Sequence, residues 1–166
     1  MEASVNLPTA WVITASNRAS KGIYKDTSGQ ILAEGLTSLG FEVTNQVVVS
    51  DDRALISAEL ETALAKKIRL IVTTGGTGIS PTDVTPEATA PWIDKLLPGI
   101  NEALRAYSRE RVPLTDLTRG IAGTTRNSLI INLPGSPGGV RDGLVIIGRL
   151  APHVLSQLEG EDHSDA

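Results

Sequence analysis

The chain has 166 residues, of which 40% are hydrophobic and 20% are charged, as expected of one globular domain that buries a core. Its net charge of −4 argues against a broad nucleic-acid surface, and the absence of cysteine excludes disulfides, thiolate metal sites and cysteine nucleophiles. No apolar run reaches the roughly 18 residues that cross a membrane, and the acidic beginning lacks a signal-peptide pattern, so we expect a cytoplasmic protein without membrane or nucleic-acid partners.

The first part of the chain predicts a strand, a loop and a helix. Residues 10–16 (AWVITAS) are apolar and β-branched, which favours a strand, and a polar, glycine-bearing loop follows them. Leu32, Leu36 and Leu39 then recur at helical spacing. Gly40 is a typical residue to end that helix.

The next segments repeat the pattern. Residues 41–49 (FEVTNQVVV) predict a second strand, and the acidic stretch at 50–52 offers helix N-cap chemistry. Apolar residues within 56–64 mark another amphipathic helix. Residues 69–74 (RLIVTT) are apolar on both faces, as a central parallel strand requires.

The second half of the chain continues the alternation. Residues 86–112 are predicted to be helical with an interruption at 97–99, and residues 128–135 (SLIINLPG) predict a fourth apolar strand. Ser136 and Pro137 suit the N-cap and first position of a last helix, with Pro152 as a candidate kink.

Alternating strands and helices predict an α/β sandwich with a mostly parallel central sheet. We expect a single domain over residues 10–158. An N-terminal extension (1–9) precedes it, and an acidic disordered tail (159–166) follows it.

The stretch TTGGTGISPTDVTPEA, residues 73–88, carries the strongest chemical signal. It places three glycines within four positions and then a carboxylate between two prolines. The glycines let backbone N–H groups approach a phosphate, and nearby Thr and Ser hydroxyls add donors. Because the carboxyl ends of parallel strands meet at one edge of a sheet, Asp51 and Asp83 are expected to lie beside this loop. Carboxylates beside phosphates usually hold Mg²⁺.

Structural interpretations of the same residues stay open at this point. The motif is neither a Walker loop nor a dinucleotide-binding fingerprint, so the glycines could form only a tight turn. Asp83 could begin a turn before a helix that starts at Pro86 with Thr85 as its N-cap, and Asp51 or Ser136 could be only a cap.

Charged and imidazole side chains outside the glycine-rich stretch carry weaker signals. Arg18 and Lys21 could be solvated charges, although a polar loop beside an anion site favours contact with the ligand. His153 and His163 lack metal-ligand spacing.

As a whole, the glycine-rich stretch closely resembles the signature of molybdenum cofactor biosynthesis proteins of the MogA/MoaB type, a domain that also occurs in gephyrin. Three further segments resemble the same family in the same order: SNRASKGIYKDTSG, VVSDDRALI and SLIINLPGSPGGVRD. Together the four segments cover roughly residues 10–155. The resemblance implies a three-layer α/β/α sandwich that assembles as a homotrimer or a multiple of it.

The resemblance also implies an activity. Enzymes of this family adenylylate molybdopterin with ATP as co-substrate and Mg²⁺ as cofactor, and release pyrophosphate before a downstream protein inserts molybdate. Asp51 and Asp83 match the two acidic positions tied to catalysis and Mg²⁺. The residues that would cradle nucleotide phosphates are Gly75, Gly76, Thr77, Gly78 and Ser80. Those that would contact substrate are Ser16, Arg18, Pro134, Gly135 and Ser136.

One departure from the family pattern stands beside these matches. The first loop reads Ser16-Asn17-Arg18, where the family often has Ser-Asp-Arg. An Asn keeps a carbonyl oxygen and loses a charge, which could weaken metal binding, shift affinity or change nothing. A non-catalytic molybdopterin-binding or scaffold protein of the same fold is therefore the alternative to an enzyme.

Overall fold

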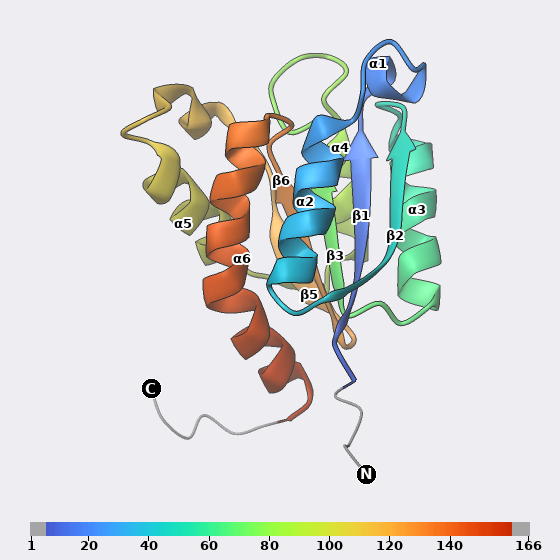
Figure 1. Cartoon of the computed structure of the whole chain (residues 1–166), viewed down its shortest axis with the longest axis vertical. Coiled ribbons are helices and arrows are strands. Elements are labelled where there is room, and N and C mark those ends of the chain that lie inside the picture. The colour runs from blue at the N-terminus through green and yellow to red at the C-terminus, as the bar shows by residue number, and fades with distance from the viewer. Residues whose placement is uncertain (1–5, 161–166) are drawn as a thin grey trace.

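A computed structural model describes residues 6–160 of the chain (Figure 1). Our expectations for residues 1–5 and for the acidic tail at 161–166 lie outside the described residues. The strands are β1 (Thr9–Ala15), β2 (Glu42–Val49), β3 (Leu70–Thr74), β4 (Lys95–Leu96), β5 (Ala122–Thr125) and β6 (Ser128–Leu133). The α-helices are α1 (Asn17–Ser20), α2 (Thr27–Ser38), α3 (Arg53–Ala65), α4 (Thr85–Thr89), α5 (Pro98–Ser108) and α6 (Pro137–Leu158). Two 3₁₀ helices are η1 (Ala90–Trp92) and η2 (Pro113–Leu117).

The strands form one sheet in the order β2-β1-β3-β6-β5-β4. Strands β2, β1, β3 and β6 are parallel, and β5 and β4 continue the sheet antiparallel. The predicted mostly parallel sheet is therefore confirmed. The register pairs Thr14 with Thr74 and Thr74 with Leu133, so the carboxyl ends of β1, β3 and β6 are level with one another.

Helices cover both faces of the sheet, which gives three layers (Figure 1). Helices α2, α5 and α6 bury Leu36, Leu104 and Ile147 in one apolar cluster. Helix α3 buries Ile56 and Leu60 in a second cluster on the other face. The central strands β1, β3 and β6 supply apolar side chains to both clusters and are buried on both faces, which agrees with the apolar runs in their sequences.

Two parts of the sequence prediction were wrong. The segment 86–112 is not one interrupted helix, because α4 ends at Thr89 and the edge strand β4 precedes α5. Strands β4 and β5 were not predicted, since KL and AGTT are too short to show a period. Pro152 lies inside α6, which continues to Leu158.

The helix caps also differ in part from the sequence prediction. Asp52, and not Asp51, caps α3 by accepting a hydrogen bond from the Leu55 amide. Thr85 is not a cap; its hydroxyl is buried and donates to the Gly75 carbonyl. Ser136 does cap α6, as predicted, through the Gly139 amide.

The amino end of β1 and the carboxyl end of α6 lie at the same edge of the sheet (Figure 1). Arg69, just before β3, donates to the Leu155 carbonyl and pairs with Glu159, which ties this edge together. Helix α1 and the loop between β3 and α4 lie at the opposite edge, where the parallel strands end. Any site built from strand-end loops therefore faces away from both ends of the described chain.

Candidate functional site

A pocket of about 640 Å³ lies at the carboxyl edge of the parallel strands. The turns that follow β1, β2, β3 and β6 all contribute to its wall. Its lining comprises Thr14, Ala15, Ser16, Asn17, Arg18, Tyr24, Lys25, Asp26, Thr27, Ser28, Asp51, Thr74, Gly75, Gly76, Thr82, Asp83, Gly135 and Pro137. Hydroxyls, amides and both signs of charge line the pocket, as a phosphate-bearing ligand would require.

The glycine-rich turn after β3 brings backbone to the pocket surface. Gly75 and Gly76 adopt φ angles of +94° and +66°, a region that other residues rarely occupy. A Cβ on Gly75 would lie 2.3 Å from the Ala15 carbonyl oxygen, and one on Gly76 would lie 2.3 Å from the Thr85 hydroxyl. Glycine is therefore required at both positions, both for backbone conformation and for space.

The turn after β6 packs directly against this glycine-rich turn. A Cβ on Gly135 would lie 3.1 Å from the Gly75 Cα, and the Gly75 amide donates to the Leu133 carbonyl at 3.1 Å. The Thr74 hydroxyl donates to the Pro134 carbonyl at 2.7 Å, and the Ser28 hydroxyl donates to the Gly135 carbonyl at 2.8 Å. The pocket wall is thus one hydrogen-bonded unit built from three distant segments.

Asp51 is held by the turn after β1. Its Oδ2 accepts a hydrogen bond from the Asn17 amide at 2.9 Å, and its own amide donates to the Asn17 Oδ1 at 2.9 Å. Its Oδ1 lies 3.3 Å from the position that a Cβ on Gly76 would occupy. The carboxylate therefore lies against the glycine-rich turn with one oxygen fixed by Asn17.

Asp83 approaches the same loop from its other end. Its Oδ2 accepts a hydrogen bond from the Ser80 amide at 3.0 Å. A Cβ on Gly78 would lie only 2.7 Å from that oxygen, so the carboxylate occupies space that a side chain at 78 would fill. The loop thus places a second carboxylate on the wall that Asp51 lines.

The pKa of Asp51 is raised above its ordinary value of 3.8. Burial is the main cause; the negative charge of Asp83 also raises this pKa, whereas the Asn17 amide lowers it. Two carboxylates on one pocket wall are a donor set that suits a hard divalent cation such as Mg²⁺. Mg²⁺ typically takes one or two protein carboxylates and completes its coordination with phosphates and water, so this pair fits it.

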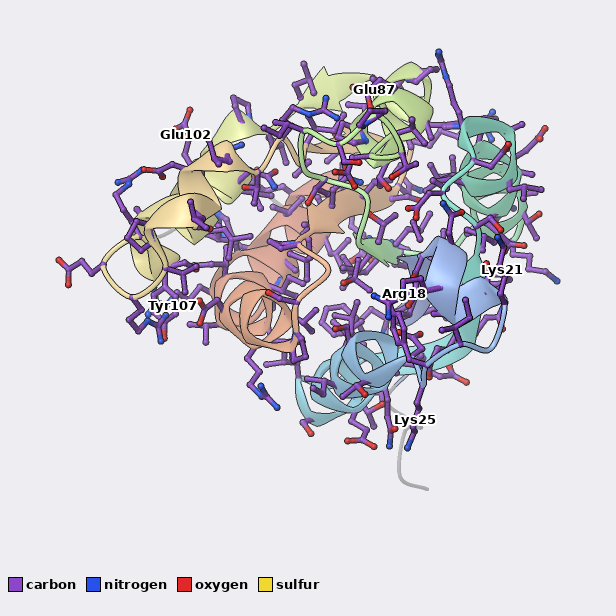
Figure 2. All side chains as sticks on the ribbon, turned by 90° about the horizontal axis from the view of Figure 1, so that it is seen from above. Arg18, Lys21, Lys25, Glu87, Glu102 and Tyr107 are labelled. Carbon is purple, nitrogen blue, oxygen red and sulfur yellow. The ribbon has the colours of Figure 1, made fainter. Side chains whose placement is uncertain are left out.

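The segment after β1 contributes positively charged side chains to the pocket lining. The Arg18 guanidinium lies 5.1 Å from the centre of the Tyr24 ring, and the Tyr24 hydroxyl hydrogen-bonds the Ser16 hydroxyl at 2.8 Å. Arg18, Tyr24 and Lys25 line the pocket, whereas Lys21 does not. Seen from above, Arg18 and Lys21 lie beside α1, with α6 between them and the Tyr107 side chain on α5 (Figure 2).

The sequence matches one protein family over most of its length. Residues 11–153 match the family described as "Probable molybdopterin binding domain". The chain belongs to this family. The sequence-based resemblance is therefore confirmed.

Named relatives and a solved structure agree with this membership. A molybdopterin adenylyltransferase of Helicobacter pylori is 40% identical over 90% of this chain and 86% of its own length. A molybdenum cofactor biosynthesis bifunctional protein of Synechococcus elongatus is 40% identical over 93% of this chain, which spans only 48% of that relative. The molybdopterin biosynthesis Mog protein of Mycobacterium ulcerans is 44% identical, with a TM-score of 0.86 over 91% of this chain and 99% of its own.

The structure brings together most of the site residues that the resemblance to this molybdopterin-binding family suggested. Seven of them line the pocket: Ser16, Arg18, Asp51, Gly75, Gly76, Asp83 and Gly135. Thr77, Gly78 and Ser80 belong to the same loop but do not line it. Pro134 and Ser136 line a separate cavity of about 320 Å³ beside α5 and α6, on the other side of the β6 turn.

Several residues of the pocket were not predicted as site residues. Asp26 caps α2 through the Gly29 amide and accepts the Thr14 hydroxyl at 2.7 Å, so it fixes the segment that carries Tyr24 and Lys25. The N-cap pattern of Asp26 before TSG was readable from the sequence. Tyr24 had no signal beyond its place in a polar loop.

Other classes of site find no support within residues 6–160. In that part of the chain, three or more His, Asp or Glu side chains never gather closely enough to hold a metal ion by themselves. His153 shares a hydrogen bond with Gln157, and His163 lies outside the described residues. Among the helices described, none is long and apolar enough to span a membrane.

Proposed function

We propose that this protein is a molybdopterin adenylyltransferase of molybdenum cofactor biosynthesis. The observation that carries the proposal is the pair Asp51 and Asp83, which both line the glycine-rich wall of a pocket of about 640 Å³. The printed name of the Helicobacter relative supports the same activity. The substrates would be ATP and molybdopterin, and the products adenylyl-molybdopterin and pyrophosphate.

The reaction is a substitution at phosphorus that transfers an adenylyl group from ATP. An oxygen of the terminal phosphate of molybdopterin attacks the α-phosphorus of ATP, and the bond from that phosphorus to the oxygen bridging the β-phosphate breaks. Pyrophosphate leaves with the electron pair of the broken bond. Since the attacking phosphate is already ionised at neutral pH, the chain needs no general base, which agrees with a pocket without histidine or cysteine.

The chain's own residues would bind and orient the phosphates. The backbone at Gly75 and Gly76 lies open to the pocket and can approach a phosphate closely. Arg18 and Lys25 would offset the negative charge of the triphosphate. Asp51 and Asp83 would hold Mg²⁺, which when bound neutralises charge on the phosphates. Ser16, Gly135 and the neighbouring turn residues Pro134 and Ser136 would border the molybdopterin side.

The proposal extends to the setting of the enzyme. We place it in the cytoplasm, as a homotrimer or a multiple of one, handing its product to a protein that inserts molybdate. The sequence resemblance carries these three statements. Analytical ultracentrifugation tests the assembly directly.

Pyrophosphate release from Mg-ATP, measured with and without molybdopterin, tests the activity. We expect release that requires molybdopterin and falls by about a hundredfold or more in Asp83→Asn, because the variant removes charge from the metal site. Molybdopterin binding without release would instead identify a carrier or scaffold. Full activity of Asp83→Asn would reject the role of that carboxylate.

A further inference from the structure

One arginine outside the pocket grips the loop that carries Asp83. The Arg119 Nε donates to the Gly78 carbonyl at 2.8 Å, and its Nη2 donates to the Asp83 carbonyl at 3.0 Å. The Arg119 backbone amide donates to the Thr77 carbonyl at 2.8 Å. Arg119 does not line the pocket itself. A single residue thus ties down three carbonyl groups of the glycine-rich loop from behind.

The guanidinium is in turn oriented by the helix that follows the loop. Glu87 lies in the first turn of α4 and pairs with the Arg119 Nη1, with a longer contact of 3.5 Å to Nη2 (Figure 2 labels Glu87). The hydrogen bond from Arg119 is the main cause that holds the pKa of Glu87 below its ordinary value. Glu87 and Arg119 are therefore a charged pair. The planar guanidinium of Arg119 faces the loop backbone.

These contacts close the loop across its ends. Between Gly78 and Asp83 the described chain has four further hydrogen bonds of its own: the Asp83 amide to the Ser80 carbonyl, the Ser80 amide to the Asp83 carboxylate, the Ser80 hydroxyl to the Thr82 hydroxyl, and a long one of 3.5 Å from the Thr82 amide to the Ser80 hydroxyl. Ser80 and Thr82 are exposed, so packing does little to hold the segment. The position of the Asp83 carboxylate thus depends on how the backbone at Gly78 and Asp83 is fixed.

We propose that Arg119, oriented by Glu87, is a positioning residue that holds Asp83 at the pocket wall for its role in the reaction. This inference rests on the proposed function for the role of Asp83, but the clamp itself is a property of the chain. Arginine is required because its fork reaches two carbonyls and a carboxylate at once, whereas lysine offers a single ammonium group. Arg119 is not a catalytic residue, since it does not line the pocket.

Arg119→Lys and Glu87→Gln test the clamp, with Arg109→Lys as the matched control. Arg109 also makes a charged pair, with Asp116, but both of these side chains are exposed at the surface and their hydrogen bonds join them to each other. The first measurement is amide hydrogen exchange of the full chain without ligand. We expect exchange at the Asp83 and Thr85 amides to rise about tenfold in Arg119→Lys and less in Glu87→Gln, with no change in the control.

The second measurement connects the clamp to Asp83. ATP affinity is titrated against Mg²⁺ in wild type, Arg119→Lys, Asp83→Asn and the double variant. We expect Arg119→Lys to raise the half-saturating Mg²⁺ concentration about tenfold in the wild-type background and to add little once Asp83 is Asn. If Arg119 had only a structural role, Arg119→Lys would lower thermal stability, and its effect on the half-saturating Mg²⁺ concentration would be the same with Asp or Asn at position 83.

Two results would overturn the inference. One is loop exchange in Arg119→Lys that matches the Arg109→Lys control. The other is an Arg119→Lys substitution that raises the half-saturating Mg²⁺ concentration by the same factor in the Asp83→Asn background as in wild type. Failure of the proposed function is a separate outcome: wild type would then release no pyrophosphate with molybdopterin, while the exchange contrast would still decide whether Arg119 clamps the loop.

Discussion

Asn17 and Asp51 exchange two hydrogen bonds of 2.9 Å each, side chain to backbone in both directions. They follow neighbouring parallel strands, so the exchange joins the turns after β1 and β2 at the pocket mouth. The Asn17 carbonyl oxygen is therefore engaged in holding the Asp51 backbone. The sequence left open whether Asn17 weakens metal binding, shifts affinity or changes nothing. The geometry gives Asn17 a bracing role that either Asn or Asp can fill.

This geometry predicts opposite effects for two substitutions of Asn17. Asn17→Ala removes the acceptor for the Asp51 amide, so we expect about a fivefold loss of adenylylation rate at low Mg²⁺, as for one lost hydrogen bond of about 1 kcal/mol. Asn17→Asp keeps the acceptor and adds a charge, which should lower the half-saturating Mg²⁺ concentration. Rates titrated against Mg²⁺ check both. An Asp variant less active than the Ala variant would contradict the bracing role.

The raised pKa of Asp51 predicts a pH-dependent cost in stability. Because the folded state binds this proton more tightly than the unfolded state, ionisation lowers the free energy of unfolding as pH rises from about 3.8 through the folded pKa. We therefore expect Asp51→Asn to raise Tm at neutral pH, in the absence of Mg²⁺ and nucleotide, while it abolishes activity. The gain in Tm should vanish below pH 3.8.

Asp52→Asn is the matched control for that experiment. It changes the neighbouring residue, where Asn is also a good N-cap for α3, so stability should stay within about 0.5 kcal/mol of wild type. Thermal unfolding of the three proteins from pH 3 to 8 gives the comparison. A lower Tm for Asp51→Asn at neutral pH would show that its hydrogen bond with Asn17 outweighs the charge cost.

A substitution of Gly78 is also expected to change activity more than stability. Since a Cβ at 78 would lie 2.7 Å from the Asp83 carboxylate, Gly78→Ala should displace that group and lower kcat by about tenfold to a hundredfold. Gly138→Ala is the control, because a Cβ there meets nothing within 4 Å in the first turn of α6. It should keep full activity and gain up to about 1 kcal/mol of stability. Equal activity of the two variants would contradict the steric argument.

Substitution of Asn132, which lies on β6 outside the pocket lining, is expected to have a large effect on stability. This fully buried side chain on β6 donates to the hydroxyls of Thr73 and Thr89 and accepts from the Ile121 amide. Asn132→Ala removes these three hydrogen bonds from the interior of the protein, so the free energy of unfolding should fall by about 2–4 kcal/mol. Urea unfolding measures it. Gln30→Ala, which loses only an exposed contact with Glu34, should cost less than about 0.5 kcal/mol.

Local sequence patterns were enough to predict the parts of the fold that have long, regular signals. The apolar runs of β1, β3 and β6 are buried on both faces, so their composition alone indicates central strands. Strand β5 is AGTT and β4 is KL, and neither has a period to detect. Their positions are set by pairing with β6, which is a tertiary relationship that the local sequence does not contain.

The site divides along the same line. Asp51 and the glycines come just after strands, and Asp83 lies in the loop that follows β3, so the rule that strand ends meet at one edge predicted that they lie together. Arg119 lies in an irregular segment with no motif and acts 36 residues away from Asp83 in the chain. Asn132 looked like one residue of an apolar strand. The roles of Arg119 and Asn132 depend on contacts between segments that are distant in the chain, so no local sequence pattern predicts them.

The edge of the sheet at which β1 begins and α6 ends has a consequence for the fusion of this domain to other polypeptides. Both attachment points lie on the side of the sheet away from the pocket, so a second polypeptide joined to either one would leave the pocket mouth open (Figure 1). The Synechococcus relative, of which this chain spans 48%, is named as a bifunctional protein. The described ends of the domain are thus placed so that a fusion partner need not obstruct the pocket.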